Sequence, residues 1–197
     1  RRCTTTDMAG RMTLFRLPLI AILRGITPDE VLAHVDALVA EGWDAIEIPT
    51  NSPDWERSVS AAARSVQPEV WIGAGTVLSS AHVDALLRAG GRLAVTPNTR
   101  PAVIAQARAQ GMQVVAGIAT PSEAFDALDA GAQMLKLFPA SVLGPDMVRA
   151  LRSVLPPVPL FAVGGVTPDS LPAYLSAGCD GVGIGGELYK PGQSVDT

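Results

Sequence analysis

Eight short apolar runs recur along the sequence at the spacing of one strand and one helix, and this repeat restricts the possible folds more than any other feature. Successive runs begin about 20 to 27 residues apart, the length of a strand followed by a helix. Most runs are apolar at nearly every position, as strands buried on both faces are. Each run therefore predicts one buried strand. The runs are Leu19–Leu23, Trp43–Ile48, Val70–Ala74, Leu93–Thr96, Met112–Ala116, Met134–Phe138, Leu160–Val163 and Gly181–Ile184.

The segments between the runs carry the residues that start and end helices. Thr27-Pro28-Asp29-Glu30 and Thr120-Pro121-Ser122-Glu123 each combine an N-cap threonine, a proline at the first helical position and a glutamate that closes a capping box. A glycine that would end a helix stands just before several runs, as in Glu41-Gly42 and Ala130-Gly131. A helix is therefore predicted between successive strands.

Eight alternating strand and helix units in 197 residues predict an α/β protein with a (β/α)₈ (TIM) barrel, formed as a single domain by residues 1–197. A doubly wound open sheet is the alternative, but it would use fewer strands, and no dinucleotide fingerprint follows the first run. We expect a helix within Thr6–Arg16, before the first strand, and we expect residues 1–10 to be disordered or a non-native start. Only Glu187–Thr197 follow the eighth run, so the final helix is expected to be missing or truncated.

Charge and cysteine content exclude several classes of protein. The net charge of −4 argues against a nucleic-acid partner or an anionic membrane, and no apolar run is long enough to span a bilayer. Cys3 and Cys179 are too few for a disulfide scaffold, which favours the cytoplasm. No cluster of His, Asp or Glu has the spacing of metal ligands, so we expect neither a metal nor a cofactor.

Lys136 lies in an apolar run of a chain whose positive charge is almost entirely arginine. Only two of the 15 basic residues are lysines, Lys136 and Lys190. Burial lowers the pKa of a lysine, and a neutral lysine is a nucleophile, whereas arginine keeps its proton. The alternative is a lysine at a strand end that extends its ammonium group into water.

The active site of a (β/α)₈ barrel lies at the C-terminal ends of its strands. Alternation along the strands directs Glu47 and Lys136 into the barrel interior if Ile46, Ile48 and Leu135 face the helices. Together the two groups can act as an acid–base pair, and the alternative is a structural ion pair that fills the barrel. Read in chain order, the strand ends carry Arg24, Glu47, Thr76, Pro97, Gly117, Lys136, Gly164, Gly165, Gly185 and Gly186.

Glycine-rich turns follow the seventh and eighth runs. In barrels these two turns commonly bind phosphate through backbone N–H groups, and glycine lets the backbone approach the anion closely. Ordinary tight turns are the alternative, but two glycine pairs on adjacent strands favour a phosphate. The pairs are Gly164 and Gly165, and Gly185 and Gly186.

Six motifs follow one another along the chain. They are Leu23-Arg24-Gly25-Ile26-Thr27, Ile46-Glu47-Ile48-Pro49, Gly73-Ala74-Gly75-Thr76-Val77, Val95-Thr96-Pro97-Asn98, Leu135-Lys136-Leu137-Phe138-Pro139 and Ala162-Val163-Gly164-Gly165-Val166. As a set and in this order they resemble the class I aldolases for 2-keto-3-deoxy-6-phospho sugar acids, the KDPG and KHG aldolase family. The similarity runs from about Leu17 to Val195, nearly the whole chain.

This resemblance implies a role for each site residue. Lys136 would form a Schiff base and Glu47 would move protons. Arg24, Thr76 and the backbone near Pro97 would hold the carboxylate end of the substrate. Further residues would bind its phosphate or line the pocket, namely Gly164, Gly165, Gly185, Gly186, Phe138 and Asn51.

The resemblance also suggests a substrate and partners. The motifs look most like the branch that acts on the 6-phosphogalactonate series, with pyruvate and glyceraldehyde 3-phosphate as products and a homotrimer as the assembly. The sister 6-phosphogluconate branch usually carries an arginine where Asn51 stands, and the family often has a serine at Gly186 and a full final helix. Three alternatives stay open: the gluconate series, a non-catalytic phosphosugar-binding barrel, and a phosphosugar isomerase or epimerase.

Overall fold

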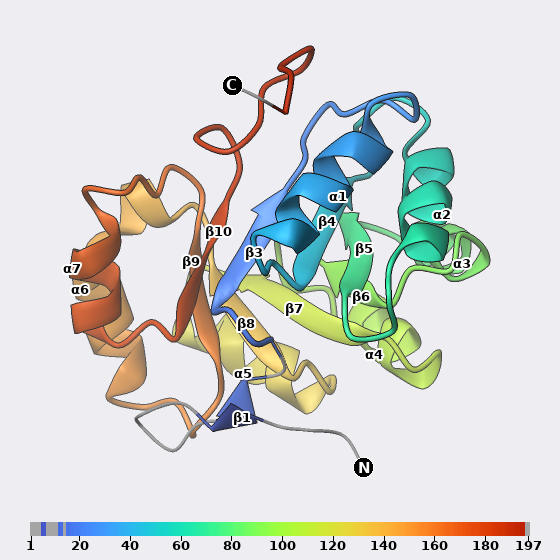
Figure 1. Ribbon diagram of the computed structural model, residues 1–197. Helices are drawn as coiled ribbons and strands as arrows, with labels where there is room; N and C mark the ends of the chain where they lie inside the picture. Colours follow the sequence, from blue (N-terminus) through green and yellow to red (C-terminus); the bar gives the residue numbers. More distant parts are fainter. Residues whose placement is uncertain (1–4, 7–11, 14, 196–197) are drawn as a thin grey trace.

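The computed structural model describes residues 5–6, 12–13 and 15–195. Within this part of the chain, eight parallel strands close into a barrel, in which each strand pairs with the next and the last pairs with the first (Figure 1). Each predicted run coincides with one strand, so the (β/α)₈ barrel is confirmed and the open sheet is wrong. The strands are β3 (Leu19–Ile22), β4 (Ala45–Pro49), β5 (Trp71–Gly75), β6 (Leu93–Val95), β7 (Gln113–Ile118), β8 (Met134–Leu137), β9 (Leu160–Val163) and β10 (Gly181–Ile184).

Helices surround the barrel and alternate with its strands (Figure 1). Seven occur in the described residues, and none of them is both long and apolar enough to cross a membrane. They are α1 (Val31–Ala40), α2 (Trp55–Ser65), α3 (Ser80–Arg88), α4 (Pro101–Ala109), α5 (Pro121–Asp129), α6 (Ala140–Arg152) and α7 (Leu171–Ala177).

The two predicted capping boxes have different outcomes. At α5 the box is confirmed, because the Thr120 hydroxyl accepts from the Glu123 N–H and the Glu123 carboxylate accepts from the Thr120 N–H. The other helix begins at Val31, three residues later than the expected start at Pro28. There the Glu30 carboxylate accepts from the Thr27 N–H at 3.2 Å and from the Thr27 hydroxyl at 2.6 Å, so half of the box forms, but no side chain caps a backbone N–H of the helix.

Alternating strand residues divide the core into two layers. One cluster contains strand residues and no helix residue, so it fills the barrel; Phe15, Met134 and Phe161 belong to it. The other joins strands to the surrounding helices and includes Leu135 and Leu137. This alternation confirms that the odd-numbered leucines of β8 face the helices, and it leaves the position between them for a side chain directed into the barrel.

The helix expected within Thr6–Arg16 is wrong for the described residues of that stretch. There β1 (Thr5–Thr6) pairs antiparallel with β2 (Met12–Thr13). Threonine is β-branched and favours extended backbone, and glycine, present at Gly10, disfavours a helix. Phe15 follows and is fully buried against Phe161 inside the barrel. The expectation for residues 1–10 otherwise lies outside the described residues.

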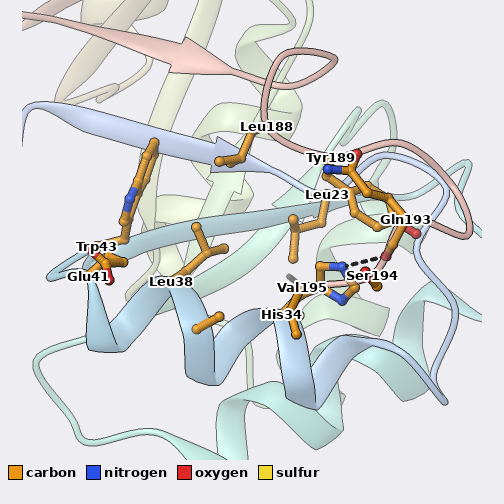
Figure 2. Close-up of a pocket in the computed structure, with 11 residues that line it drawn as sticks. Leu23, His34, Leu38, Glu41, Trp43, Leu188, Tyr189, Gln193, Ser194 and Val195 are labelled. Carbon is orange, nitrogen blue, oxygen red and sulfur yellow. Dashed lines mark hydrogen bonds between the residues drawn. The ribbon is translucent and has the colours of Figure 1, made fainter. Parts of the chain in front are cut away.

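No α-helix follows β10 in residues 185–195, as expected from the sequence. The segment instead makes a turn after Gly185 and then runs beside α1 (Figure 2). His34 of α1 meets the Tyr189 ring edge-on at 4.9 Å between centroids, and its Nε2 lies 3.0 Å from the Gln193 carbonyl oxygen. The C-terminal segment therefore occupies part of the surface that an eighth helix would cover.

Candidate active site

Lys136 is the third residue of β8 and is buried, with 4% of its surface exposed. Its Nζ lies 5.1 Å from the centroid of the Phe138 ring. Burial lowers the pKa of the Lys136 ammonium to about 8, an effect that the Glu47 charge opposes and the Arg24 charge reinforces. The side chain therefore does not extend freely into water, and a substantial fraction of it is neutral near physiological pH.

Glu47 is in the middle of β4 and is 2% exposed. Burial raises the pKa of its carboxyl group to about 7, against the opposing charges of Lys136 and Arg24. Its Oε2 atom has no hydrogen-bond partner among the described residues, whereas a purely structural ion pair would satisfy that oxygen. A carboxylate with a pKa near neutrality and a free oxygen can accept and return a proton.

The Glu47 carboxylate lies over a glycine of the neighbouring strand, and that position has no side chain for a steric reason. A Cβ at Gly75, on the neighbouring strand β5, would lie 1.7 Å from the Glu47 Oε2 atom. Any larger residue would displace the carboxylate. The absence of a side chain at Gly75 thus provides the space that the Glu47 carboxylate occupies.

These groups face one cavity of about 820 Å³ at the C-terminal ends of the strands. Its size is in the range of small-molecule sites. The cavity brings together all but one of the residues predicted for the site: Arg24, Glu47, Thr76, Pro97, Lys136, Phe138, Gly164, Gly165, Gly185 and Gly186. Asn51 is the exception, because it does not line the cavity. It contacts the lining residue Arg24, whose Nη1 donates to the Asn51 Oδ1 at 2.8 Å.

Sequence reasoning missed part of the cavity wall. Thr167 lines it, and so does the C-terminal segment, with Glu187, Tyr189, Lys190 and Pro191. Both stretches follow directly on the glycine turns after β9 and β10. Their position at the strand ends was the signal that could have found them.

The glycine turns have the backbone geometry of an anion site. Gly164 and Gly165 have φ of +95° and +72°, which side chains rarely adopt. A Cβ at Gly165 would also lie 2.5 Å from the Ser141 Oγ atom. At Gly186 a Cβ would meet no described atom within 4 Å, so that position faces open space. Neither turn itself contains a lysine or arginine, so the turns can bind an anion only through their backbone dipoles.

Among the described residues, no group of three or more His, Cys, Asp or Glu side chains could hold a metal ion. The chemistry that the site can perform is centred on Lys136, because its lowered pKa makes a neutral amine available. Fold and site together define a (β/α)₈-barrel protein with a buried lysine and carboxylate in its cavity, an arrangement that can support imine formation and proton transfer.

The chain belongs to the KDPG and KHG aldolase family, whose sequence model matches residues 11–196. It is 56% identical over 182 residues to the 2-dehydro-3-deoxy-6-phosphogalactonate aldolase of Escherichia coli K12, covering 92% of this chain and 89% of the relative.

Two solved structures carry the comparison further. A structure of native KDPGal superimposes with a TM-score of 0.90 at 55% identity, covering 92% of this chain and 88% of the other. A KDPG aldolase of Legionella pneumophila, with pyruvate captured as a covalent carbinolamine, superimposes with a TM-score of 0.80 at 25% identity, covering 87% and 84%.

Proposed function

We propose that this protein is a Schiff-base lyase that cleaves 2-dehydro-3-deoxy-6-phosphogalactonate into pyruvate and D-glyceraldehyde 3-phosphate, a step of D-galactonate breakdown. The observation that carries the proposal is that Lys136 and Glu47 are both buried in the cavity. Burial brings the pKa of each group close to neutral pH, to about 8 for Lys136 and about 7 for Glu47. The galactonate series rests on the relative at 56% identity.

The proposed reaction uses both groups in turn. The neutral Lys136 amine attacks the C2 ketone, and loss of water gives a protonated imine. Glu47, directly or through water, accepts the proton of the C4 hydroxyl as the C3–C4 bond breaks. The electron pair of that bond moves into the imine to give an enamine, and the aldehyde leaves. Protonation of the enamine at C3 and hydrolysis release pyruvate and restore the amine.

Other cavity residues bind the two charged ends of the substrate. We assign the carboxylate end to Arg24, Thr76 and the backbone near Pro97, with Phe138 beside the reacting carbons. The phosphate is assigned to the backbone N–H groups of the glycine turns. The residues of those turns are Gly164, Gly165, Gly185 and Gly186.

Imine formation is expected to speed up as the pH rises towards about 8 and then to level off. The amine must be neutral, and burial places the pKa of Lys136 at about 8. Glu47, with a pKa of about 7, also reaches its proton-accepting form over this range, so cleavage should rise in the same direction. The measurement is the rate of borohydride trapping with subsaturating pyruvate across pH. A rate that climbs steadily to the ordinary lysine pKa of 10.5 would contradict the assignment.

Gly186→Ser is expected to strengthen binding of the phosphate alone. The open space at Gly186 accommodates the side chain, and the hydroxyl adds one donor worth about 1 kcal/mol if aligned. The KM of the phosphorylated substrate should therefore fall several-fold, while trapping with pyruvate, which has no phosphate, should not change. If trapping changes and the KM does not, the phosphate binds elsewhere.

Two assays test the function itself. Pyruvate with borohydride should give an irreversible mass gain at Lys136; its absence would favour a non-catalytic phosphosugar-binding barrel, an isomerase or an epimerase. Cleavage of the two C4 epimers should then be compared. Faster cleavage of the gluconate epimer would replace the galactonate assignment with the 6-phosphogluconate activity.

We also propose a homotrimer located in the cytoplasm, with residues 1–197 as one domain. The trimer follows from the family resemblance, and the location from the small number of cysteines. Light scattering of the purified protein measures the assembly, and a monomer at assay concentration would contradict it.

A further inference from the structure

The loop after β4 contacts the carboxylate end of the cavity with three successive side chains. Thr50, Asn51 and Ser52 do not line the cavity. Each makes a hydrogen bond to a residue that does: Thr50 to Thr76, Asn51 to Arg24, and Ser52 to Gly25.

Thr50 holds the backbone on both sides of Thr76. Its N–H donates to the Gly75 carbonyl oxygen at 2.8 Å, and its hydroxyl donates to the Thr76 carbonyl oxygen at 2.7 Å. These two carbonyls belong to the peptide groups that flank Thr76. Thr76 itself has φ of +56°, a conformation that a β-branched residue adopts only when its surroundings impose it. Thr50 lies outside the cavity and hydrogen-bonds to both peptide groups of this conformation.

Asn51 and Ser52 act in the same way on the turn that follows β3. Arg24 has a long, solvent-exposed side chain that would otherwise sample many rotamers, and its guanidinium donates to the Asn51 Oδ1 at 2.8 Å. The Ser52 Oγ accepts from the Gly25 N–H at 2.9 Å. Ser52 is 6% exposed, so this bond fixes the turn that carries Arg24 from a buried position.

We propose that Thr50, Asn51 and Ser52 are positioning residues for the carboxylate end of the keto acid, holding Arg24 and Thr76 where a carboxylate attached to the imine carbon meets both. The inference rests on the proposed Schiff-base function and extends it. Neighbouring residues of one loop order two binding groups that come from different strands, so the loop preorganises the subsite before substrate enters.

The test uses two ketones. Cyanoborohydride traps the imine that each ketone forms at Lys136, and mass spectrometry measures the adduct. Pyruvate carries the carboxylate and acetone lacks it. In Thr50→Val and Asn51→Ala the half-saturating concentration of pyruvate should rise about threefold to tenfold, the loss of one hydrogen bond. The second-order rate constant for acetone should stay within about twofold of the unmodified protein, because only carboxylate binding depends on the loop. Thr50→Ser, which keeps the hydroxyl, should restore pyruvate binding.

A double-mutant cycle shows whether Asn51 acts through Arg24. In an Arg24→Ala background, Asn51→Ala should cause no further rise in the half-saturating pyruvate concentration. Thr120→Val is the matched control: it removes a hydroxyl at the same end of the barrel, from a residue that caps α5 and does not line the cavity. It should bind pyruvate like the unmodified protein.

Several outcomes would overturn the inference. The inference is wrong if the half-saturating pyruvate concentration is unchanged in both loop variants. It is also wrong if trapping with pyruvate and trapping with acetone weaken equally, because that result indicates general damage to the barrel. An Asn51→Ala effect that persists undiminished without Arg24 would exclude the proposed route. If the unmodified protein is trapped at Lys136 and the loop variants bind pyruvate equally well, only this inference is overturned. If the unmodified protein is not trapped at Lys136, the proposed function is overturned as well.

Discussion

Lys136→Arg is expected to abolish both pyruvate trapping and substrate cleavage while the barrel remains folded. Arginine keeps the positive charge beside Glu47 but cannot become a neutral amine, so no imine can form. Because the Lys136 site is 4% exposed and arginine is larger, Lys136→Met serves as a second variant of similar length without the charge. Circular dichroism and thermal melting check the fold, and mass spectrometry after borohydride reduction checks for the adduct.

The second lysine of the chain supplies the control for that experiment. Lys190 belongs to the C-terminal segment, is exposed, and lines the mouth of the same cavity. In Lys136→Arg it should acquire no adduct, because it lies on the exposed C-terminal segment and not in the buried part of the cavity. An adduct on Lys190, or measurable turnover in either Lys136 variant, would contradict the assignment of Lys136.

Glu47→Gln is expected to slow turnover by about 10²- to 10⁴-fold while imine formation with pyruvate continues. The amide keeps the volume of the side chain and loses the proton acceptor. The Glu47 charge raises the pKa of Lys136, so its removal should lower that pKa further. Trapping should therefore reach its plateau at lower pH in the variant. Steady-state turnover and the pH profile of trapping are measured on the same preparation.

Glu123→Gln provides the matched substitution outside the cavity. Glu123 closes the capping box of α5, and glutamine can make the same hydrogen bonds to the backbone. This variant should turn over substrate at the normal rate. Near-normal turnover in Glu47→Gln would mean that another group, or water alone, moves the proton of the C4 hydroxyl.

The strand repeat and most of the cavity residues were predictable from local sequence. Strands buried on both faces must be apolar throughout, so a charged residue inside such a run stands out, as Lys136 does in β8 and Glu47 does in β4. The glycine pair after β9 stands where positive φ and close approach both exclude a side chain. Neither restraint holds at Gly185 and Gly186 after β10, which were recognisable only as a second glycine pair on the adjacent strand.

The first residues were predicted less well than the barrel. A helix was expected within Thr6–Arg16, yet its described residues form β1 and β2 and bury Phe15 inside the barrel. Intrinsic propensity is a weak signal over so short a stretch, and contacts with distant residues such as Phe161 decide the outcome.

The sequence by itself determined the order of strands and helices, the barrel, and which residues stand at its C-terminal end, because these depend on periodicity and on the residue types that each backbone position tolerates. Only the tertiary structure decided which of these residues meet. The pKa values of Lys136 and Glu47 come from joint burial across the barrel, and the hydrogen bonds of Thr50 and Asn51 join residues 26 and 27 positions apart. Desolvation and hydrogen bonding depend on distance in space, which no local pattern records.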